Sequence, residues 1–321
     1  MTVLPGLDAA FLETLDDFIA GDPMQPGVRW TNLSLRDLSA ELKRKGFHLS
    51  APSVSQLLRR HQLGRRKPQK TRPQGRHRDQ DRQFLRIANL RKQYTASPNP
   101  ILSIDTKKKE LIGNLIRHGW VYTTRTLDAA DHDFPSLASG VVFPHGLYDT
   151  KRNLGHINLG LSHDTSRFAG DSLEYWWQTY GRPAYPQADS ILVLCDGGGS
   201  NAANRYVFKH AIEQLATRIG LEVRVAHYPP YCSKYNPIEH RLFPHVTKAC
   251  QGVIFYSTEL VVKTMSRTQT RTGLRTTVSL FPGEYPTGEK APPGYKKTMG
   301  ILFDDDLPKW NYRAVPAKPG S

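Results

Sequence analysis

The spacing of apolar residues changes near residue 100, and this change constrains the fold more than any other feature of the chain. Before it, apolar residues recur at helical intervals, which predicts helices over residues 7–19, 35–45, 50–64 and 79–94. After it, short apolar runs alternate with helical stretches, which predicts strands over 101–105, 140–149, 156–161, 191–195 and 223–228. This order indicates an α/β domain with a mixed sheet, preceded by an all-α region.

Two of the early helices have the outline of a helix-turn-helix. Ser34 and Asp37 form a capping-box-like start, Gly46 ends that helix, and Gly64 ends the next one. Two short amphipathic helices joined by a glycine-containing turn are typical of this motif, although ordinary helical hairpins share the outline. The polar side of the second helix carries side chains that suit base edges and phosphates: Ser53, Ser55, Gln56, Arg59 and Arg60.

The positive charge of the chain is concentrated next to this motif. The formal net charge is +15, and residues 29–92 hold 18 lysines and arginines against 4 acids. Residues 65–78 contain seven of these cations, two prolines and no acid, and Arg65, Arg66 and Lys67 open that run. A basic segment joined to a nearly neutral body indicates a nucleic-acid partner, held largely through its phosphates.

Several classes of protein are excluded. The clean apolar runs, such as 191–195, are far shorter than the ~20 residues that span a bilayer, so no membrane partner is expected. The N-terminus carries acids and lacks the basic region of a secretory signal. The three cysteines form no C-x-x-C pair, which argues against a disulfide scaffold or zinc ribbon and fits a reducing cytoplasm.

Three carboxylates occupy positions that suit a site at the edge of a sheet. Asp105 and Asp196 each end an apolar run, and Glu239 lies in the first turn of a predicted helix. Acids at strand ends project into the crevice where open α/β sheets place their sites. Turn chemistry and helix-dipole compensation would explain each acid singly. Three acids brought together need a cation, and hard oxygen ligands suit two Mg²⁺ or Mn²⁺ ions that act on a phosphodiester.

Eight stretches of the second half form a recognisable series: SIDTKKKELIGN (103–114), HDFP (132–135), GLYDTKRNLGHINLGLSHDT (146–165), WWQTYGRPAYPQA (176–188), DGGGSN (196–201), PPYCSKYNPIEHRLF (229–243), TRTGLR (270–275) and YPTG (285–288). The series resembles the Rhodopirellula-type DDE transposase family of bacterial insertion sequences, a relative of the mariner-like group. The resemblance implies an RNase H-like fold, a mixed sheet flanked by helices, with Asp105, Asp196 and Glu239 as catalytic and metal-binding triad. The 43-residue interval from Asp196 to Glu239 is longer than is common in mariner-like enzymes.

In this family, Asp105 would bridge both metals while Asp196 binds one and Glu239 the other. A metal-activated water would cut the element's ends, and the freed 3′-hydroxyl would attack target DNA. Implied partners are double-stranded DNA, as terminal inverted repeats and target, and a second copy in a synaptic homodimer. The implied location is the bacterial cytoplasm, associated with the nucleoid. Family members carry more sequence before the helix-turn-helix, so a first DNA-binding helical unit is expected to be missing here.

We therefore expect a helical DNA-binding region over 1–64, a basic linker and helix over 65–99, an RNase H-like catalytic domain over 100–273, and a loop-rich C-terminal extension over 274–321. Further DNA contacts are expected near the acids from Lys107, Asn201, Lys234 and His240. Asp304, Asp305 and Asp306 are interpreted as exposed and not catalytic.

Other interpretations of the sequence stay open or are rejected. The chain could be a truncated, inactive or regulatory DNA-binding remnant, or an RNase H-like nuclease that cuts without rejoining. Asn236-Pro-Ile-Glu-His240 lacks the first histidine of an inverted zinc-peptidase motif. The glycines after Asp196 do not match a dinucleotide-binding loop and are better suited to a close approach of the backbone to DNA.

Overall fold

The structure is a computed structural model that describes residues 4–18, 20–21, 29–31, 33–66, 77–130, 132 and 134–317. Contacts divide the chain into two units, Met1–Thr71 and Arg72–Ser321, and each is described by itself. Most of the basic run 65–78, Lys67 included, lies outside the described residues. No helix within the described ranges combines the length and apolarity needed to cross a bilayer.

The first unit is built on three helices: α1 (Leu7–Phe18), α2 (Leu35–Arg44) and α3 (Ala51–Arg60). Ser34 caps α2 through the backbone N–H of Asp37, whose carboxylate accepts the N–H of Ser34, so the expected capping box is present. Gly46 turns the chain toward α3 at a φ of +88°. Buried leucines, Phe11 and Val54 from all three helices form one core, which gives the helix-turn-helix its fixed shape. A short pair of strands, β1 (Ala20–Gly21) and β2 (Arg29–Trp30), completes the unit.

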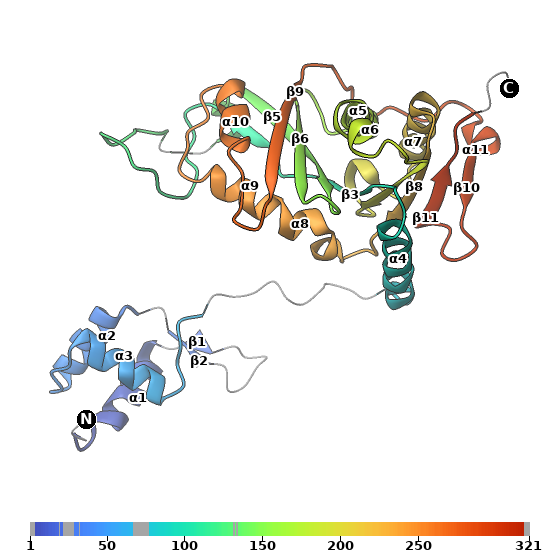
Figure 1. The fold of residues 1–321 in the computed structure, drawn as a ribbon. Coiled ribbons are helices and arrows are strands. Elements are labelled where there is room, and N and C mark those ends of the chain that lie inside the picture. Colours follow the sequence, from blue (N-terminus) through green and yellow to red (C-terminus); the bar gives the residue numbers. More distant parts are fainter. Residues whose placement is uncertain are drawn as a thin grey trace. The chain divides into compact units, whose positions relative to one another are not determined.

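The second unit contains a nine-stranded mixed sheet (Figure 1). Its order is β10-β11-β8-β7-β3-β5-β6-β9, with β4 paired to β5. The three early strands β3, β5 and β6 are antiparallel neighbours, and β7 and β8 continue the sheet parallel to β3. The strands are β3 (Ile101–Thr106), β4 (Glu110–Ile112), β5 (Gly140–Asp149), β6 (Leu154–Gly160), β7 (Ser190–Cys195), β8 (Glu222–His227), β9 (Arg275–Phe281), β10 (Ile301–Phe303) and β11 (Asn311–Ala314). This arrangement confirms the predicted mixed sheet of an α/β domain.

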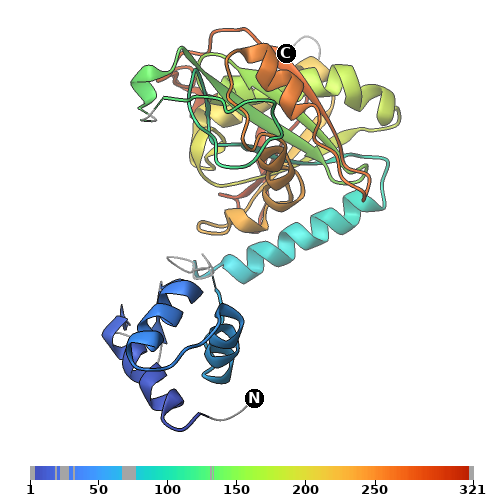
Figure 2. The ribbon, with the colours of Figure 1, turned by 90° about the vertical axis from the view of Figure 1, so that its left-hand side faces the viewer.

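Helices cover both faces of this sheet because successive strand residues alternate between two cores. One core packs Leu102, Val193 and Val225 against α5 and α7, and Trp176 and Trp177 lie in it. On the opposite face α4 packs on Leu192 and Leu194, while α8, α9 and α10 pack on the early strands. Figure 2 shows α4 as a long separate helix beside the sheet. The helices are α4 (Gln80–Thr95), α5 (Ser166–Trp176), α6 (Arg182–Ala184), α7 (Tyr206–Ile219), α8 (Pro237–Arg241), α9 (Phe243–Ala249), α10 (Thr258–Met265) and α11 (Tyr295–Thr298), and a π-helical turn (Trp177–Gly181) joins α5 to α6.

The C-terminal residues differ from the loop-rich extension that the sequence predicts. Strand β9 pairs in parallel with β6 at one edge, and β11 pairs with β8 at the other. The expectation that Asp304 is exposed is also wrong, because its side chain is buried between Arg224 (2.6 Å) and Arg86 (2.5 Å). Strands β9, β10 and β11 therefore extend the sheet, and Asp304 ties this segment to helix α4.

Candidate active site

The sheet brings Asp105 and Asp196 to the same edge. Asp105 lies in β3 and Asp196 directly follows β7, its parallel neighbour. In this ladder Ser103 pairs with Leu194. Two residues further along each strand, Asp105 and Asp196 therefore lie side by side. Parallel strands end at one edge of a sheet, which is where open α/β folds place their sites. The expectation that these two acids converge is met by the strand register itself.

Glu239 joins them from α8, a short helix that lies directly on the sheet. The backbone N–H of Ile238 donates to Ser103 Oγ (2.9 Å), so the first turn of α8 is fixed to β3. Gly146 in β5, the register partner of Asp105, leaves room for the helix: a Cβ there would lie 2.7 Å from Ile238 and Phe243 carbons. The glycine thus allows α8 to approach closely enough to place Glu239 beside Asp105.

The three carboxyl groups interact electrostatically. Burial, the charge of Asp196 and a shared hydrogen bond with Glu239 raise the pKa of Asp105 to about 8, although the Thr106 N–H (2.8 Å) opposes this. Burial and the charge of Glu239 likewise raise the pKa of Asp196 to about 6, and a hydrogen bond from Asn236 opposes the rise. Like charges in a partly dehydrated site favour protonation of one member. Such a cluster at a sheet edge is the electrostatic signature of a functional site.

The donor set fits a hard divalent cation. All three groups offer carboxylate oxygens, which Mg²⁺ and Mn²⁺ prefer, and a dication would relieve the repulsion that raises the pKa values of Asp105 and Asp196. No group of three His, Cys, Asp or Glu side chains among the described residues is arranged as a formed metal site. The three acids are therefore adjacent without being gathered about one centre, and the shared hydrogen bond of Asp105 and Glu239 reduces their repulsion in this arrangement.

Asn236 connects β3, the end of β7 and α8, a role that no sequence motif indicated. Its Nδ2 donates to Asp196 Oδ1 (3.3 Å) and to the Ile104 carbonyl (3.1 Å). Its Oδ1 accepts from Ser103 Oγ (2.5 Å). The side chain is fully buried, so these contacts have no competition from water. Its place before the proline that opens α8 is the signal that could have revealed it as a structural joint.

Asp196 is also held from the other side of the sheet edge. The buried His227 donates from Nδ1 to the Asp196 backbone carbonyl (3.0 Å). Its Nε2 accepts from the Tyr312 hydroxyl (3.1 Å), which belongs to the C-terminal strand β11. Burial lowers the pKa of His227 to about 4, so the ring is neutral and keeps this donor–acceptor pattern. The C-terminal strand thereby supports the candidate catalytic residue Asp196.

The DNA contacts expected near the acids fall into two groups. Lys234 and His240 are exposed, on the turn before α8 and on α8 itself. Lys107 is mostly buried and forms an ion pair with Glu110 (2.6 Å). Asn201 is buried, only 2% exposed, and so does not reach the surface in this conformation. The structure therefore brings Lys234 and His240, but not Asn201, to the surface beside the acids.

The expected contacts in the first unit lie on or just after α3. Gln56 and Arg59 are exposed, while Ser53 and Ser55 are half-buried. Arg60 donates to the carboxylate of Asp8 in α1 (3.0 Å), so part of its hydrogen-bonding capacity is used within the unit. Arg65 and Arg66 are exposed after the helix. Among the expected contacts on α3, Gln56 and Arg59 are consequently the side chains most accessible to a DNA partner.

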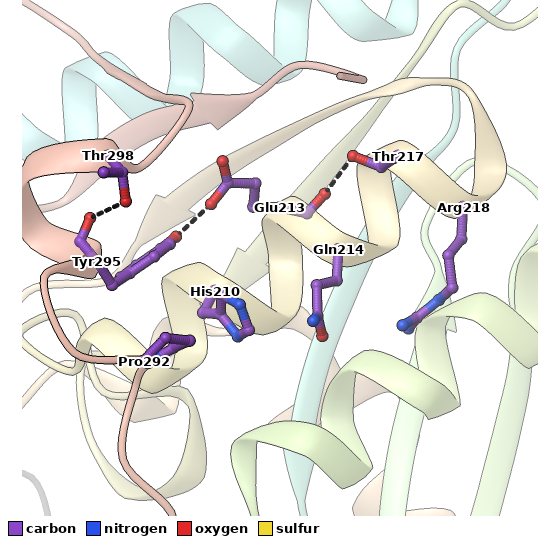
Figure 3. A pocket seen from close by; sticks show the side chains of 8 residues that line it. All are labelled: His210, Glu213, Gln214, Thr217, Arg218, Pro292, Tyr295 and Thr298. Atoms are coloured by element: carbon purple, nitrogen blue, oxygen red, sulfur yellow. Dashed lines mark hydrogen bonds between the residues drawn. The ribbon is translucent and has the colours of Figure 1, made fainter. Parts of the chain in front are cut away.

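A surface pocket of about 490 Å³ lies elsewhere, between α7 and the segment around α11 (Figure 3). Tyr295 donates to Glu213 across it (2.6 Å), and Glu213 also accepts the N–H of Gly300 (2.5 Å). Arg218 at its rim pairs with Glu174 (2.6 Å). Glu213 is satisfied by the C-terminal segment and Arg218 by α5, so this pocket is the seam where the C-terminal segment packs on α7.

Comparison with known proteins places the chain in a family. Residues 10–316 match the family described as Rhodopirellula transposase DDE domain. Among solved structures, the Mos1 transposase paired-end complex with left transposon end matches at 16% identity and a TM-score of 0.46, over 82% of this chain and 71% of that one. The Mos1 mariner paired-end complex with Mn matches at 18% identity and a TM-score of 0.43, over 80% and 69%. No curated protein matches significantly. The match over nearly the whole length shows that the chain belongs to the Rhodopirellula transposase DDE domain family.

Proposed function

We propose that Asp105, Asp196 and Glu239 are the catalytic residues with which this insertion-sequence DDE transposase cuts and joins DNA. The observation that carries the proposal is the convergence of three carboxyls from β3, the end of β7 and α8, with the pKa values of Asp105 and Asp196 raised by burial and by the neighbouring acids. Acids that repel one another cost the fold stability, and such groups are concentrated at functional sites.

DDE transposases use divalent metal ions, and two Mg²⁺ or Mn²⁺ ions are the proposed form here. Asp105, Asp196 and Glu239 are the residues that would hold these ions. Bound there, the ions would lower the pKa of a water and stabilise charge on the scissile phosphate. The chain itself fixes the acids: Asn236 and His227 hold Asp196, the Thr106 N–H holds Asp105, and Ser103 anchors the helix that carries Glu239.

Residues 1–64 are proposed to hold the element's terminal repeats, with 65–99 as linker and helix, 100–273 as catalytic domain and 274–321 as extension. The exposed Gln56 and Arg59 on α3 would enter a major groove, and Arg65, Arg66 and Lys67 would follow phosphates. Lys234 and His240 would contact DNA next to the acids. Double-stranded DNA, both element ends and target, is the proposed substrate.

A homodimer is proposed because two element ends have to be joined in one complex. The segment between β4 and β5 supports a macromolecular contact, since Trp120 is 97% exposed, Tyr122 is fully exposed and Phe134 is largely exposed. Sedimentation of the full chain with end DNA should give two chains per complex. A Trp120→Ser, Tyr122→Ser variant that still pairs two ends would show that the contact lies elsewhere.

The direct test is metal-dependent nicking and strand transfer on the inverted repeats that flank the gene. Asp105→Asn, Asp196→Asn and Glu239→Gln should each lose cleavage by more than about 1,000-fold while DNA binding is kept. Cleavage without joined product would instead identify a nuclease, and binding without cleavage in either Mg²⁺ or Mn²⁺ a regulatory remnant. Three variants that cut as well as the parent would remove the triad from the mechanism.

A further inference from the structure

Tyr231 has an unusual backbone conformation beside the candidate catalytic acids. It lies in the turn from β8, next to the strand that precedes Asp196, to α8, which carries Glu239. Its φ is +63°, a left-handed value that glycine or asparagine adopts readily and a bulky L-residue rarely does. Such a conformation costs of order 1 kcal/mol, and strained residues of this kind cluster at functional sites.

The surrounding turn is held by hydrogen bonds and ring packing on both sides of Tyr231. Tyr228 donates its N–H to the Cys195 carbonyl (2.8 Å), which ties the turn to the residue before Asp196. Cys232 donates to the Pro229 carbonyl (3.2 Å) and is buried under the turn. The ring of Tyr235 packs edge-on against Phe84 of α4 (5.0 Å between centroids). The residues before and after Tyr231 are thus fixed by contacts with the sheet and with α4.

The Tyr231 side chain contributes little packing to the fold. It is 61% exposed, whereas the neighbouring Tyr228 and Cys232 are buried. An asparagine or glycine would satisfy the backbone with less strain, so packing and turn geometry do not explain a tyrosine at this position. An aromatic ring presented to solvent by a strained turn that hydrogen bonds hold in place has the properties of a contact surface.

The residues next to Tyr231 on the turn indicate which kind of ligand this surface would bind. Tyr235 is 49% exposed, and Lys234 Nζ lies 5.2 Å from its ring centroid. The segment 229–238 contains one lysine and no acid, although it leads from β8, the neighbour of the strand that precedes Asp196, into α8, which carries Glu239. Aromatic rings interspersed with a cation are the pattern that binds unpaired nucleobases, because every base has a face that can stack and a phosphate that attracts the cation.

We propose that Tyr231 stacks on an unpaired nucleobase of the DNA end and so holds the cut strand at the active site. This inference rests on the proposed catalytic role of Asp105, Asp196 and Glu239, since it places the strand over those acids. The ligand is a base of single-stranded character at the element end, and its identity is open because stacking tolerates every base.

The test uses the full chain and an element-end duplex with a single-stranded extension that carries 2-aminopurine. Parent protein should quench the fluorescence of one extension position through stacking. Tyr231→Asn should abolish that quenching and weaken binding of the extended duplex about 5- to 100-fold, with no loss of thermal stability because asparagine fits the left-handed backbone. Tyr231→Phe should restore quenching, since the ring and not the hydroxyl makes the contact.

Phe303→Asn is the matched control, an exposed aromatic of strand β10 whose replacement should leave quenching and binding unchanged. Quenching by Tyr231→Asn at the parent level would overturn the inference. A fall in its melting temperature greater than that of the control would also overturn it, by showing that the ring supports the fold. Quenching needs no cleavage, so if Asp105→Asn still cuts, the catalytic proposal fails while the stacking result stands.

Discussion

The buried side-chain amide of Asn236 positions two of the three acids, Asp196 and Glu239, without being one of the proposed catalytic residues. It bonds Asp196 directly, and through Ser103 it fixes the start of the helix that carries Glu239. Removing its side chain leaves the Ser103 O–H without its acceptor and Asp196 Oδ1 without this donor. Loss of a buried partner of this kind costs about 1–3 kcal/mol, and a displacement near 1 Å costs about 100-fold in rate.

We therefore expect Asn236→Ala to lower cleavage by about 100-fold and the free energy of unfolding by about 1–3 kcal/mol. Cleavage of end DNA and urea unfolding measure the two effects. Asn99→Ala is the control, because Asn99 bonds the Asp189 side chain (2.8 Å) and backbone (3.0 Å) away from the three acids. It should lose comparable stability and keep its rate. Equal loss of rate in both variants would mean that Asn236 acts through stability alone.

His156 in β6 should make the stability of the catalytic unit depend on pH. Its Nδ1 lies 2.7 Å from Thr277 Oγ1, and burial lowers its pKa from 6.5 to about 4, with a smaller effect from Arg152. The unfolded chain therefore takes up the proton first as pH falls. Stability is complete above pH 6.5 and decreases from there toward pH 4.

Between pH 7.5 and pH 5 this residue should cost about 1–2 kcal/mol of unfolding free energy. Urea unfolding of the parent and of His156→Gln at both pH values measures the difference. The pH-dependent loss should be smaller in the variant by that amount. An identical loss in both proteins would assign the acid sensitivity to other buried groups.

At the scale of elements, the packing of α8 on β5 decides where Glu239 lies. Gly146→Ala would put a Cβ 2.7 Å from Ile238 and Phe243 carbons, so the helix has to move outward. Overpacking of this kind costs about 1–3 kcal/mol, and we expect cleavage to fall more than DNA binding. Gly140→Ala in the same strand is the control, since its Cβ would be 3.8 Å from Ile112, an ordinary contact. Full activity in Gly146→Ala would show that α8 tolerates the shift.

The elements show what the sequence could and could not predict. Local periodicity located the helices before residue 100 and the five strands near Asp105 and Asp196, because apolar spacing reports burial directly. The strands β9, β10 and β11 escaped prediction, since their partners are distant in sequence and β9 is mostly exposed or half-buried. Asp304 escaped for the same reason, as its arginine partners lie on α4 and β8.

The candidate site likewise contains residues that the sequence predicted and residues that it did not. The three acids were predicted from strand-end positions and from the family resemblance, and the register of β3 and β7 supports that placement. Asn236, Ser103 and His227 were not identified, because a buried hydrogen-bond network is defined by contacts across the sheet. Tyr231 could not be distinguished from other tyrosines without its backbone angle.

At the scale of the whole molecule, the basic segment 29–92 does not end where the first structural unit ends, at Thr71. The basic segment 29–92 extends into α4, whose residues Ile87, Leu90 and Tyr94 belong to a core of the catalytic unit. Helix α4 also holds the C-terminal segment through Arg86 and Asp304. A truncation that tests DNA binding must therefore end before α4, within residues 67–76, or it will damage the sheet as well.

A chain of residues 77–321 should keep the sheet and the triad and lose most of its DNA affinity. It lacks 13 of the 18 cations found between 29 and 92. For every phosphate that the shortened chain no longer neutralises, the slope of log affinity against log salt should fall by about 0.9. Titration of end DNA at several salt concentrations measures this, and circular dichroism checks that the shortened chain is folded. The reduction should be several times that of Arg59→Ala in the full chain, which removes one exposed cation of α3. An unchanged affinity and slope in the folded, shortened chain would place DNA binding in residues 77–321, where 31 lysines and arginines against 22 acids still leave an excess of positive charge for phosphates.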